Sequence, residues 1–134
     1  MHPHVLLIED DRDAREMLAL LLQSEGMYVT LALNGVDGLQ ALEASKTLPD
    51  IILLDLQMPV MGGQEFFTAL KKMHADTSRI PVVVLTGTNK ILPEAAATIR
   101  KPFHMDQLLT VIHATVNSYG GRRRPAKKRA ASQE

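Results

Sequence analysis

The heptapeptide Val5-Leu6-Leu7-Ile8-Glu9-Asp10-Asp11 decides the fold class of this chain. Its four consecutive apolar residues are too few for a helix, and three acidic residues end the run. An unbroken apolar run, as opposed to an alternating one, is typical of a strand that is covered on both faces, as in a parallel sheet. The segment therefore predicts a buried parallel strand with carboxylates at its carboxyl end.

The same succession of an apolar run, a turn signal and a helical pattern recurs along the chain. Further strands are predicted at residues 29–33, 51–54, 81–85 and 97–99. Apolar residues at helical spacing predict helices over residues 14–22, 36–42, 66–73 and 108–116. The last helix is expected to end near Gly120-Gly121. Strands that alternate with helices indicate an α/β fold, a doubly wound five-stranded parallel sheet with right-handed crossovers.

Composition excludes several classes of protein. The 134 residues contain no cysteine, which excludes a disulfide framework, a thiolate zinc site and a cysteine nucleophile. The longest apolar run, residues 17–22, is far shorter than the ~20 residues of a membrane span. Acidic residues follow the first apolar run at once, so we expect no signal peptide and a reducing cytoplasm as the setting.

The formal net charge of zero conceals two oppositely charged parts. Residues 1–121 carry a net charge of −5, and residues 122–134 carry +5. The basic segment has no aromatic residue for base stacking and little apolar content beyond alanine, so we expect a disordered, solvated tail after a domain of residues 1–121. A weak contact with an acidic partner is the alternative, and specific nucleic-acid binding is not expected.

Chemically complementary side chains lie at the carboxyl ends of the predicted strands. Four of these strands end in a polar residue or pair: Glu9 and Asp10, Asp55, Thr86, and Lys101. Ligands of an open parallel sheet bind outside these ends. Clustered carboxylates repel one another unless a cation neutralises them, and their oxygens suit Mg²⁺. A carboxylate can also accept a phosphoryl group, so we expect a site for a divalent ion and a phosphoryl group.

These motifs resemble the receiver domain of response regulators in two-component signalling, in its stand-alone, chemotaxis-regulator-like form. The matching segments, spread over most of residues 4–119, are residues 5–11, 49–63, 81–87 and 101–103. The resemblance implies a flavodoxin-like sheet with strand order 2-1-3-4-5. It also implies Mg²⁺-dependent phosphorylation by a histidine kinase or a phosphotransfer protein, which switches binding to a downstream protein.

The resemblance assigns roles in phosphoryl chemistry to three side chains. Asp55 would accept the phosphoryl group, Thr86 would bond one phosphoryl oxygen, and Lys101 would pair with another. The family's cis peptide bond before proline would lie at Lys101-Pro102.

The resemblance also implies a set of metal ligands. Asp10 would bind Mg²⁺ directly and Glu9 through water, with Asp55 and the backbone carbonyl of Gln57 completing the protein ligands. The neighbouring Asp11 is better suited to cap the first helix.

Two departures from the family pattern concern the output of the switch. The interval between Thr86 and Lys101 is shorter than receivers commonly have, which leaves room for a fourth helix of one or two turns between residues 89 and 97. Receivers usually dimerise through this region, so we expect a monomer or a weak dimer. Thr98 stands where receivers often carry an aromatic residue, so the coupling to the output must run differently or be weak.

Two other function classes remain open beside the phosphorylation switch. An aspartate-nucleophile phosphatase would carry a second aspartate two residues after Asp55, where this chain has Gln57. We therefore expect no enzyme for external substrates, only catalysis of the chain's own phosphorylation and dephosphorylation. The alternative is a phosphorylation-independent interaction module, which would have little need for the complete set Glu9, Asp10, Asp55, Thr86 and Lys101.

Overall fold

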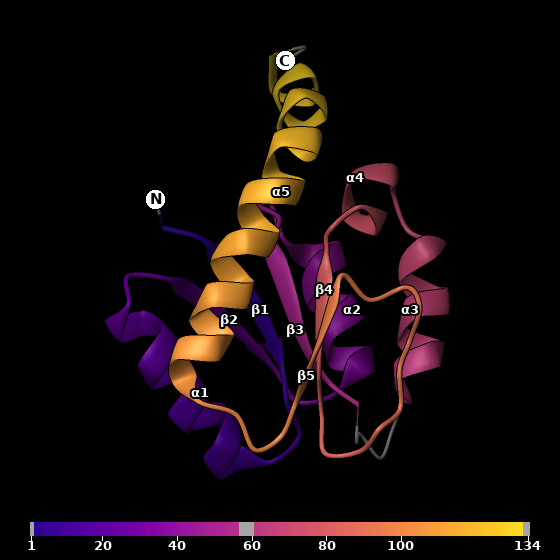
Figure 1. The fold of residues 1–134 in the computed structure, drawn as a ribbon. Coiled ribbons are helices and arrows are strands. Elements are labelled where there is room, and N and C mark those ends of the chain that lie inside the picture. Colours follow the sequence, from indigo (N-terminus) through magenta and orange to yellow (C-terminus); the bar gives the residue numbers. More distant parts are fainter. Residues whose placement is uncertain (1, 57–60, 133–134) are drawn as a thin grey trace.

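The computed structural model describes residues 2–56 and 61–132, which form one parallel sheet covered by helices (Figure 1). The strands are β1 (His4–Ile8), β2 (Tyr28–Ala32), β3 (Ile51–Asp55), β4 (Val82–Thr86) and β5 (Ala97–Arg100). The helices are α1 (Arg12–Ser24), α2 (Gly35–Ala44), α3 (Gly63–Lys71), α4 (Ala75–Ser78) and α5 (Met105–Ser132). The strand order β2-β1-β3-β4-β5 confirms the prediction, and every predicted strand forms with small shifts at its ends.

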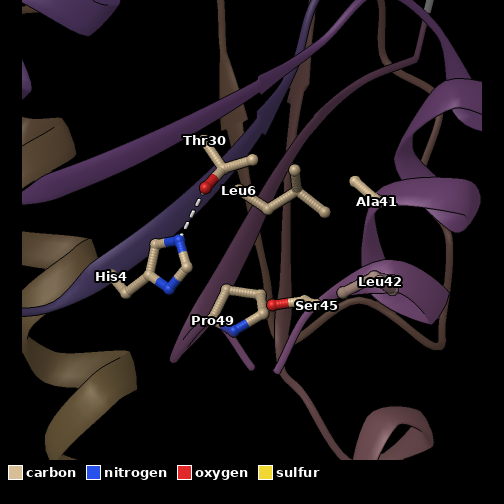
Figure 2. Close-up of a pocket in the computed structure, with 7 residues that line it drawn as sticks. All are labelled: His4, Leu6, Thr30, Ala41, Leu42, Ser45 and Pro49. Atoms are coloured by element: carbon tan, nitrogen blue, oxygen red, sulfur yellow. Dashed lines mark hydrogen bonds between the residues drawn. The ribbon is translucent and has the colours of Figure 1, made fainter. Parts of the chain in front are cut away.

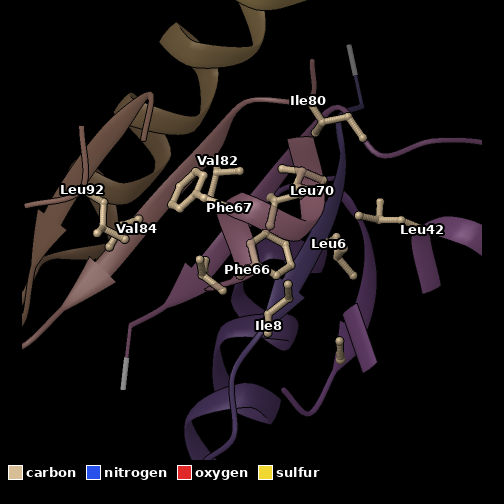
Figure 3. Packing of buried hydrophobic residues seen from close by; sticks show 13 residues of the cluster. Leu6, Ile8, Leu42, Phe66, Phe67, Leu70, Ile80, Val82, Val84 and Leu92 are labelled. Atoms are coloured by element: carbon tan, nitrogen blue, oxygen red, sulfur yellow. The ribbon is translucent and has the colours of Figure 1, made fainter. Parts of the chain in front are cut away.

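The two faces of the sheet bury two separate apolar clusters. Leu6 and Ile8 of β1 pack on the face covered by α2 and α3, where Phe66 is fully buried (Figure 3). Val5 and Leu7 point to the opposite face, which α1 and α5 cover. Successive side chains of a strand alternate between faces. Because both faces are covered, every residue of the run must be apolar, which explains the unbroken pattern in the sequence.

The register of the sheet brings the functional ends of the strands to one edge. Ile8 pairs with Leu54 across β1 and β3, so the residues that follow them, Glu9 and Asp55, leave the sheet side by side. On the other side of β3, the Lys101 N–H donates to the Thr86 carbonyl oxygen at 2.7 Å. The edge therefore collects residues that lie far apart in the sequence.

The connection between β4 and β5 corrects one sequence prediction. Residues 87–96 contain bends and a turn but no helix, where a fourth helix of one or two turns was predicted. The short α4 lies before β4 instead. A helix advances about 1.5 Å per residue and an extended chain about 3.3 Å, so a short return across the sheet must be extended. Leu92 of this connection, 5% exposed, fills the covered face beside Val84.

Helix α5 corrects a second prediction. It continues to Ser132, beyond the Gly120-Gly121 pair at which it was expected to end. Glycine lowers helix stability by about 1 kcal/mol but does not forbid a helix. None of the helices in the part of the chain described is both long and apolar enough to cross a membrane.

Candidate functional site

The turn between β1 and α1 carries the acidic pair. Glu9 is buried, with 1% of its surface exposed, whereas its neighbour Asp10 points to solvent. The Asp11 N–H donates to Glu9 Oε2 at 3.2 Å, and the Asp11 side chain accepts from the Ala14 N–H, which confirms its predicted role as the cap of α1. Arg15 of α1 donates from Nη1 to the carbonyl oxygens of Glu9 at 2.9 Å and of Asp10 at 3.3 Å.

Three carboxylates and one ammonium meet at the carboxyl edge of the sheet. One carboxylate oxygen each from Glu9, Asp10 and Asp55 lie within 4.8 Å of one another. The Lys101 Nζ atom lies 3.4 Å from Asp55 Oδ2 and 3.6 Å from Glu9 Oε1. The structure thus brings together four of the side chains that the sequence placed in the site.

Burial and a second carboxylate change the acidity of Glu9. Loss of water, first, and then the hydrogen bond and negative charge of Asp55 raise the pKa of Glu9 from 4.5 to about 7. The Asp11 N–H and the positive charge of Lys101 act in the opposite direction but do not offset burial. Glu9 is therefore only partly ionised near neutral pH until a further cation compensates its charge.

The donor set fits a hard divalent cation. The buried Glu9 Oε1 atom has no hydrogen-bond donor among the described residues, and the ammonium of Lys101 only approaches it. Carboxylate oxygens on one side and open solvent at Asp10 on the other suit Mg²⁺, which binds one or two carboxylates and keeps several waters. The predicted backbone ligand Gln57 lies outside the described residues.

Thr86 ends β4 at the same edge and is 1% exposed. Its Oγ1 atom accepts from the Thr88 N–H at 3.1 Å and lies 3.1 Å from Thr88 Oγ1. Thr88 Oγ1 in turn accepts from the Lys90 N–H at 3.2 Å. The hydroxyl that was predicted to bind a phosphoryl oxygen is therefore engaged by the loop that follows it.

One feature of the β5 region matches the sequence prediction. The Lys101-Pro102 peptide bond is cis, as predicted. Thr98, which stands where receivers often carry an aromatic residue, is exposed on β5.

Two residues beside the site, Arg15 and Thr88, were not predicted from the sequence. Arg15 follows the acidic pair by less than two helical turns, which places its long side chain within reach of their backbone. Thr88 follows Thr86 by two residues, the spacing at which a hydroxyl accepts from a backbone N–H in a tight turn. Both patterns are visible in the sequence but are too common to single out these residues.

A cavity at the opposite end of the sheet takes no part in this site. It lies between β1, β2 and α2, and at about 10 Å³ it is at most the size of one water molecule (Figure 2). His4 Nε2 and Thr30 Oγ1, 2.7 Å apart, lie at its wall. The cavity is too small for a substrate, so the carboxyl edge remains the candidate functional site.

Fold and site define the class of protein: a doubly wound α/β domain with an acidic cluster, able to hold a cation, at the carboxyl edge of its sheet. The chain matches the response regulator receiver domain over residues 5–113. It belongs to this family of two-component signalling domains.

Relatives of known name agree with this assignment. The uncharacterized transcriptional regulatory protein YkoG of Bacillus subtilis is 32% identical over 124 residues, which cover 87% of this chain and 52% of YkoG. The transcriptional regulatory protein PrrA of Mycobacterium leprae is 32% identical over 125 residues, covering 88% of this chain and 52% of PrrA. The chain thus spans about half the length of these curated relatives.

A solved structure gives the same fold. The chemotaxis response regulator CheY4 of Vibrio cholerae is 29% identical to this chain and superposes with a TM-score of 0.72. The match covers 86% of this chain and 99% of CheY4. The five-stranded receiver fold is therefore common to both proteins.

Proposed function

We propose that the chain is a phosphorylation switch, in which a histidine kinase or a phosphotransfer protein transfers a phosphoryl group to Asp55 in the presence of Mg²⁺. The observation that carries this proposal is the position of the Asp55 carboxylate between the Glu9–Asp10 pair and the Lys101 ammonium. A nucleophile flanked by an acidic cation site and a fixed positive charge is the arrangement that phosphoryl transfer requires.

Each side chain has a separate task in this proposal. An Asp55 oxygen forms the bond to phosphorus while the bond from phosphorus to the donor histidine nitrogen breaks, and that nitrogen keeps the electron pair. Bound Mg²⁺ supplies positive charge for the phosphoryl oxygens, and Glu9, Asp10, Asp55 and the Gln57 carbonyl would hold it. Lys101, 3.4 Å from Asp55, would pair with another phosphoryl oxygen.

Phosphorylation would bring the Thr86 hydroxyl into a hydrogen bond with a phosphoryl oxygen. The new group adds about −2 charge and strong acceptors beside Thr86. Donation from Thr86 to a phosphoryl oxygen would compete with its contact to the Thr88 hydroxyl, so residues 87–90 would rearrange. With Thr98 exposed on β5, this loop is the segment that would carry the change to a downstream protein.

A phosphorylation-independent interaction module is the second candidate. The absence of a helix between β4 and β5, at residues 87–96, favours it, because this region usually responds in the family. The acidic cluster and its lysine argue for the active switch. Turnover of external substrates is not part of either proposal.

The remaining features are part of the same proposal. We place the receiver at residues 1–121, with residues 122–134 as a separate basic segment. The names of the relatives describe transcriptional regulation, whereas we propose a protein partner as the readout of this chain. The cytoplasmic setting and the monomeric or weakly dimeric state remain predictions.

Intact mass spectrometry after incubation with acetyl phosphate tests the proposal. The wild type should gain one phosphoryl group only when Mg²⁺ is present, and Asp55→Ala should gain none. The control Asp106→Ala, which removes an exposed carboxylate at the start of α5, should behave as the wild type. If the folded wild type takes up neither a phosphoryl group nor beryllofluoride, the interaction module is the better description.

A further inference from the structure

Arg15 forms hydrogen bonds with the backbone of the three acidic residues that follow β1. Its Nη1 atom donates to the Glu9 carbonyl oxygen at 2.9 Å and to the Asp10 carbonyl oxygen at 3.3 Å. Its own backbone N–H donates to the Asp11 carbonyl oxygen at 2.9 Å. This last bond is the first backbone bond of α1, which any residue would make, so the half-buried Arg15 side chain contacts two consecutive carbonyls of the turn.

The same turn is held from two other directions. The Glu9 N–H donates to the Ala32 carbonyl oxygen at the end of β2, at 3.1 Å. The Asp11 N–H donates to the Glu9 side chain at 3.2 Å, which sets the orientation of that carboxylate. Arg15 supplies the contact from α1 and is the only one of these groups that brings a positive charge. The direction in which the Glu9 and Asp10 side chains leave the backbone depends on all three contacts.

We propose that Arg15 is a positioning residue for the divalent-cation site. Its two side-chain hydrogen bonds fix the backbone on both sides of Asp10. They thereby hold the carboxylates of Glu9 and Asp10 close to that of Asp55, although the three negative charges repel one another. This inference rests on the proposed function, because it takes Mg²⁺ as the cation that the three carboxylates bind.

The choice of acceptors separates Arg15 from Lys101. Among the described residues, Arg15 bonds to carbonyl oxygens and not to carboxylates, so it leaves the acidic side chains available to a metal. Lys101 contacts the carboxylates of Glu9 and Asp55 directly. Groups that orient metal ligands in this indirect way typically change metal affinity by about 10–100-fold when they are removed.

A purely electrostatic role for Arg15 predicts the opposite result. If Arg15 acted only as a nearby positive charge, its removal would reduce repulsion of the cation and strengthen Mg²⁺ binding. The positioning role predicts weaker binding, because the ligands would no longer be held together in advance. The sign of the change in affinity therefore distinguishes the two roles.

Calorimetric titration of the full chain with MgCl₂ tests the proposal. Arg15→Ala should weaken Mg²⁺ binding roughly tenfold. Arg15→Lys should recover most of this loss, since both side-chain bonds leave a single nitrogen and an ammonium carries enough donors to replace it. Arg12→Ala is the matched control, because Arg12 is exposed on the same helix and its Nε atom bonds to Glu16 at 3.1 Å. This control should leave the affinity unchanged.

Thermal unfolding without metal separates positioning from general stability. Should Arg15→Ala fail to fold, Arg15→Gln, which keeps a donor but no charge, takes its place. Variants that unfold at a lower temperature yet bind Mg²⁺ as the wild type does would overturn the proposal, as would tighter binding. A wild type that binds no Mg²⁺ would overturn the proposed function and this inference together. A wild type that binds Mg²⁺, with Arg15→Ala equal to it, would overturn this inference alone.

Discussion

The Lys101 ammonium lies 3.4 Å from Asp55 Oδ2, although the two residues come from strands that β4 separates. Asp55 ends β3 and Lys101 follows β5, so the lysine side chain reaches across the end of β4 to meet the carboxylate. The same ammonium is 3.6 Å from Glu9 Oε1. One cation from the edge of the sheet thus compensates two carboxylates from its centre.

Lys101→Met should destabilise the metal-free protein, because two buried carboxylates then face each other without a cation. We expect a loss of about 1–2 kcal/mol at pH 8, less than for a fully buried ion pair because the lysine side chain is 35% exposed. At pH 5.5 the loss should be smaller, since a protonated Glu9 relieves the repulsion. Urea unfolding measures both values, with the exposed Lys90→Met as control. Equal losses at the two pH values would contradict this account.

Glu9 should make the metal-free protein less stable as the pH rises. The pKa of Glu9 is about 7 in the folded protein and near 4.5 when it is exposed, so the folded state binds more protons between these values. Stability contributed by neutral Glu9 is therefore complete below about pH 4.5 and is lost as the pH rises through about 7. At about 1.4 kcal/mol per pKa unit, the loss is on the order of 3 kcal/mol.

Urea unfolding in EDTA between pH 5 and pH 8 measures this effect. The difference in free energy of unfolding between Glu9→Gln and the wild type should grow with pH, because glutamine does not ionise. Titration of groups that do not interact with Glu9 cancels in that difference. Curves that stay parallel over the whole range would show that Glu9 is not the group responsible. Mg²⁺ should stabilise the wild type more at pH 8 than at pH 5, because the ion binds the ionised carboxylate.

Thr88→Val should loosen the turn that follows β4. The substitution removes the hydroxyl that lies 3.1 Å from Thr86 Oγ1 and accepts from the Lys90 N–H. We expect a loss of about 1 kcal/mol and faster hydrogen exchange at the Lys90 amide. Because Thr86 then has fewer competing contacts, beryllofluoride should bind more tightly. Thr98→Val, on the exposed side of β5, is the control. An unchanged exchange rate at Lys90 would refute the role of Thr88.

Leu92→Ala should be strongly destabilising although Leu92 lies in a connection without a helix. Its side chain is 5% exposed, and its Cδ1 atom would lie 2.9 Å from a Cβ atom at Gly63, so it packs closely against the start of α3. Removing it should cost about 2–4 kcal/mol. Its neighbour Ile91 is 73% exposed, so Ile91→Ala should change stability by at most about 0.5 kcal/mol. Similar losses from both variants in urea unfolding would show that Leu92 does not fill the core.

Much of this site was predictable from short segments of sequence. The unbroken run before Glu9 requires a strand covered on both faces, and Pro49-Asp50 followed by apolar residues to Asp55 repeats the pattern. In a parallel sheet such strands end at the same edge, so proximity of their acidic ends follows from the fold class alone. The capping role of Asp11 was also predictable, because a helix cap depends only on residues within one turn.

The structure of two segments depended on more than local pattern. The resemblance to receiver domains suggested a short helix in the β4–β5 interval, but the distance that the chain must cover imposes an extended path with Leu92 buried. A glycine pair suggested the end of α5, but the helix continues through it to Ser132. Chain geometry decided the first case.

By itself the sequence determined which residues form the strands and which side chains meet at their carboxyl ends, because burial on both faces demands an unbroken apolar run. Only the tertiary structure decided that Glu9 is buried with a raised pKa while the adjacent Asp10 is exposed. Both residues are acidic and follow the same strand, so nothing local distinguishes them. Their environments differ because Asp55 and Lys101, brought in from distant parts of the chain, enclose one carboxylate and leave the other at the surface.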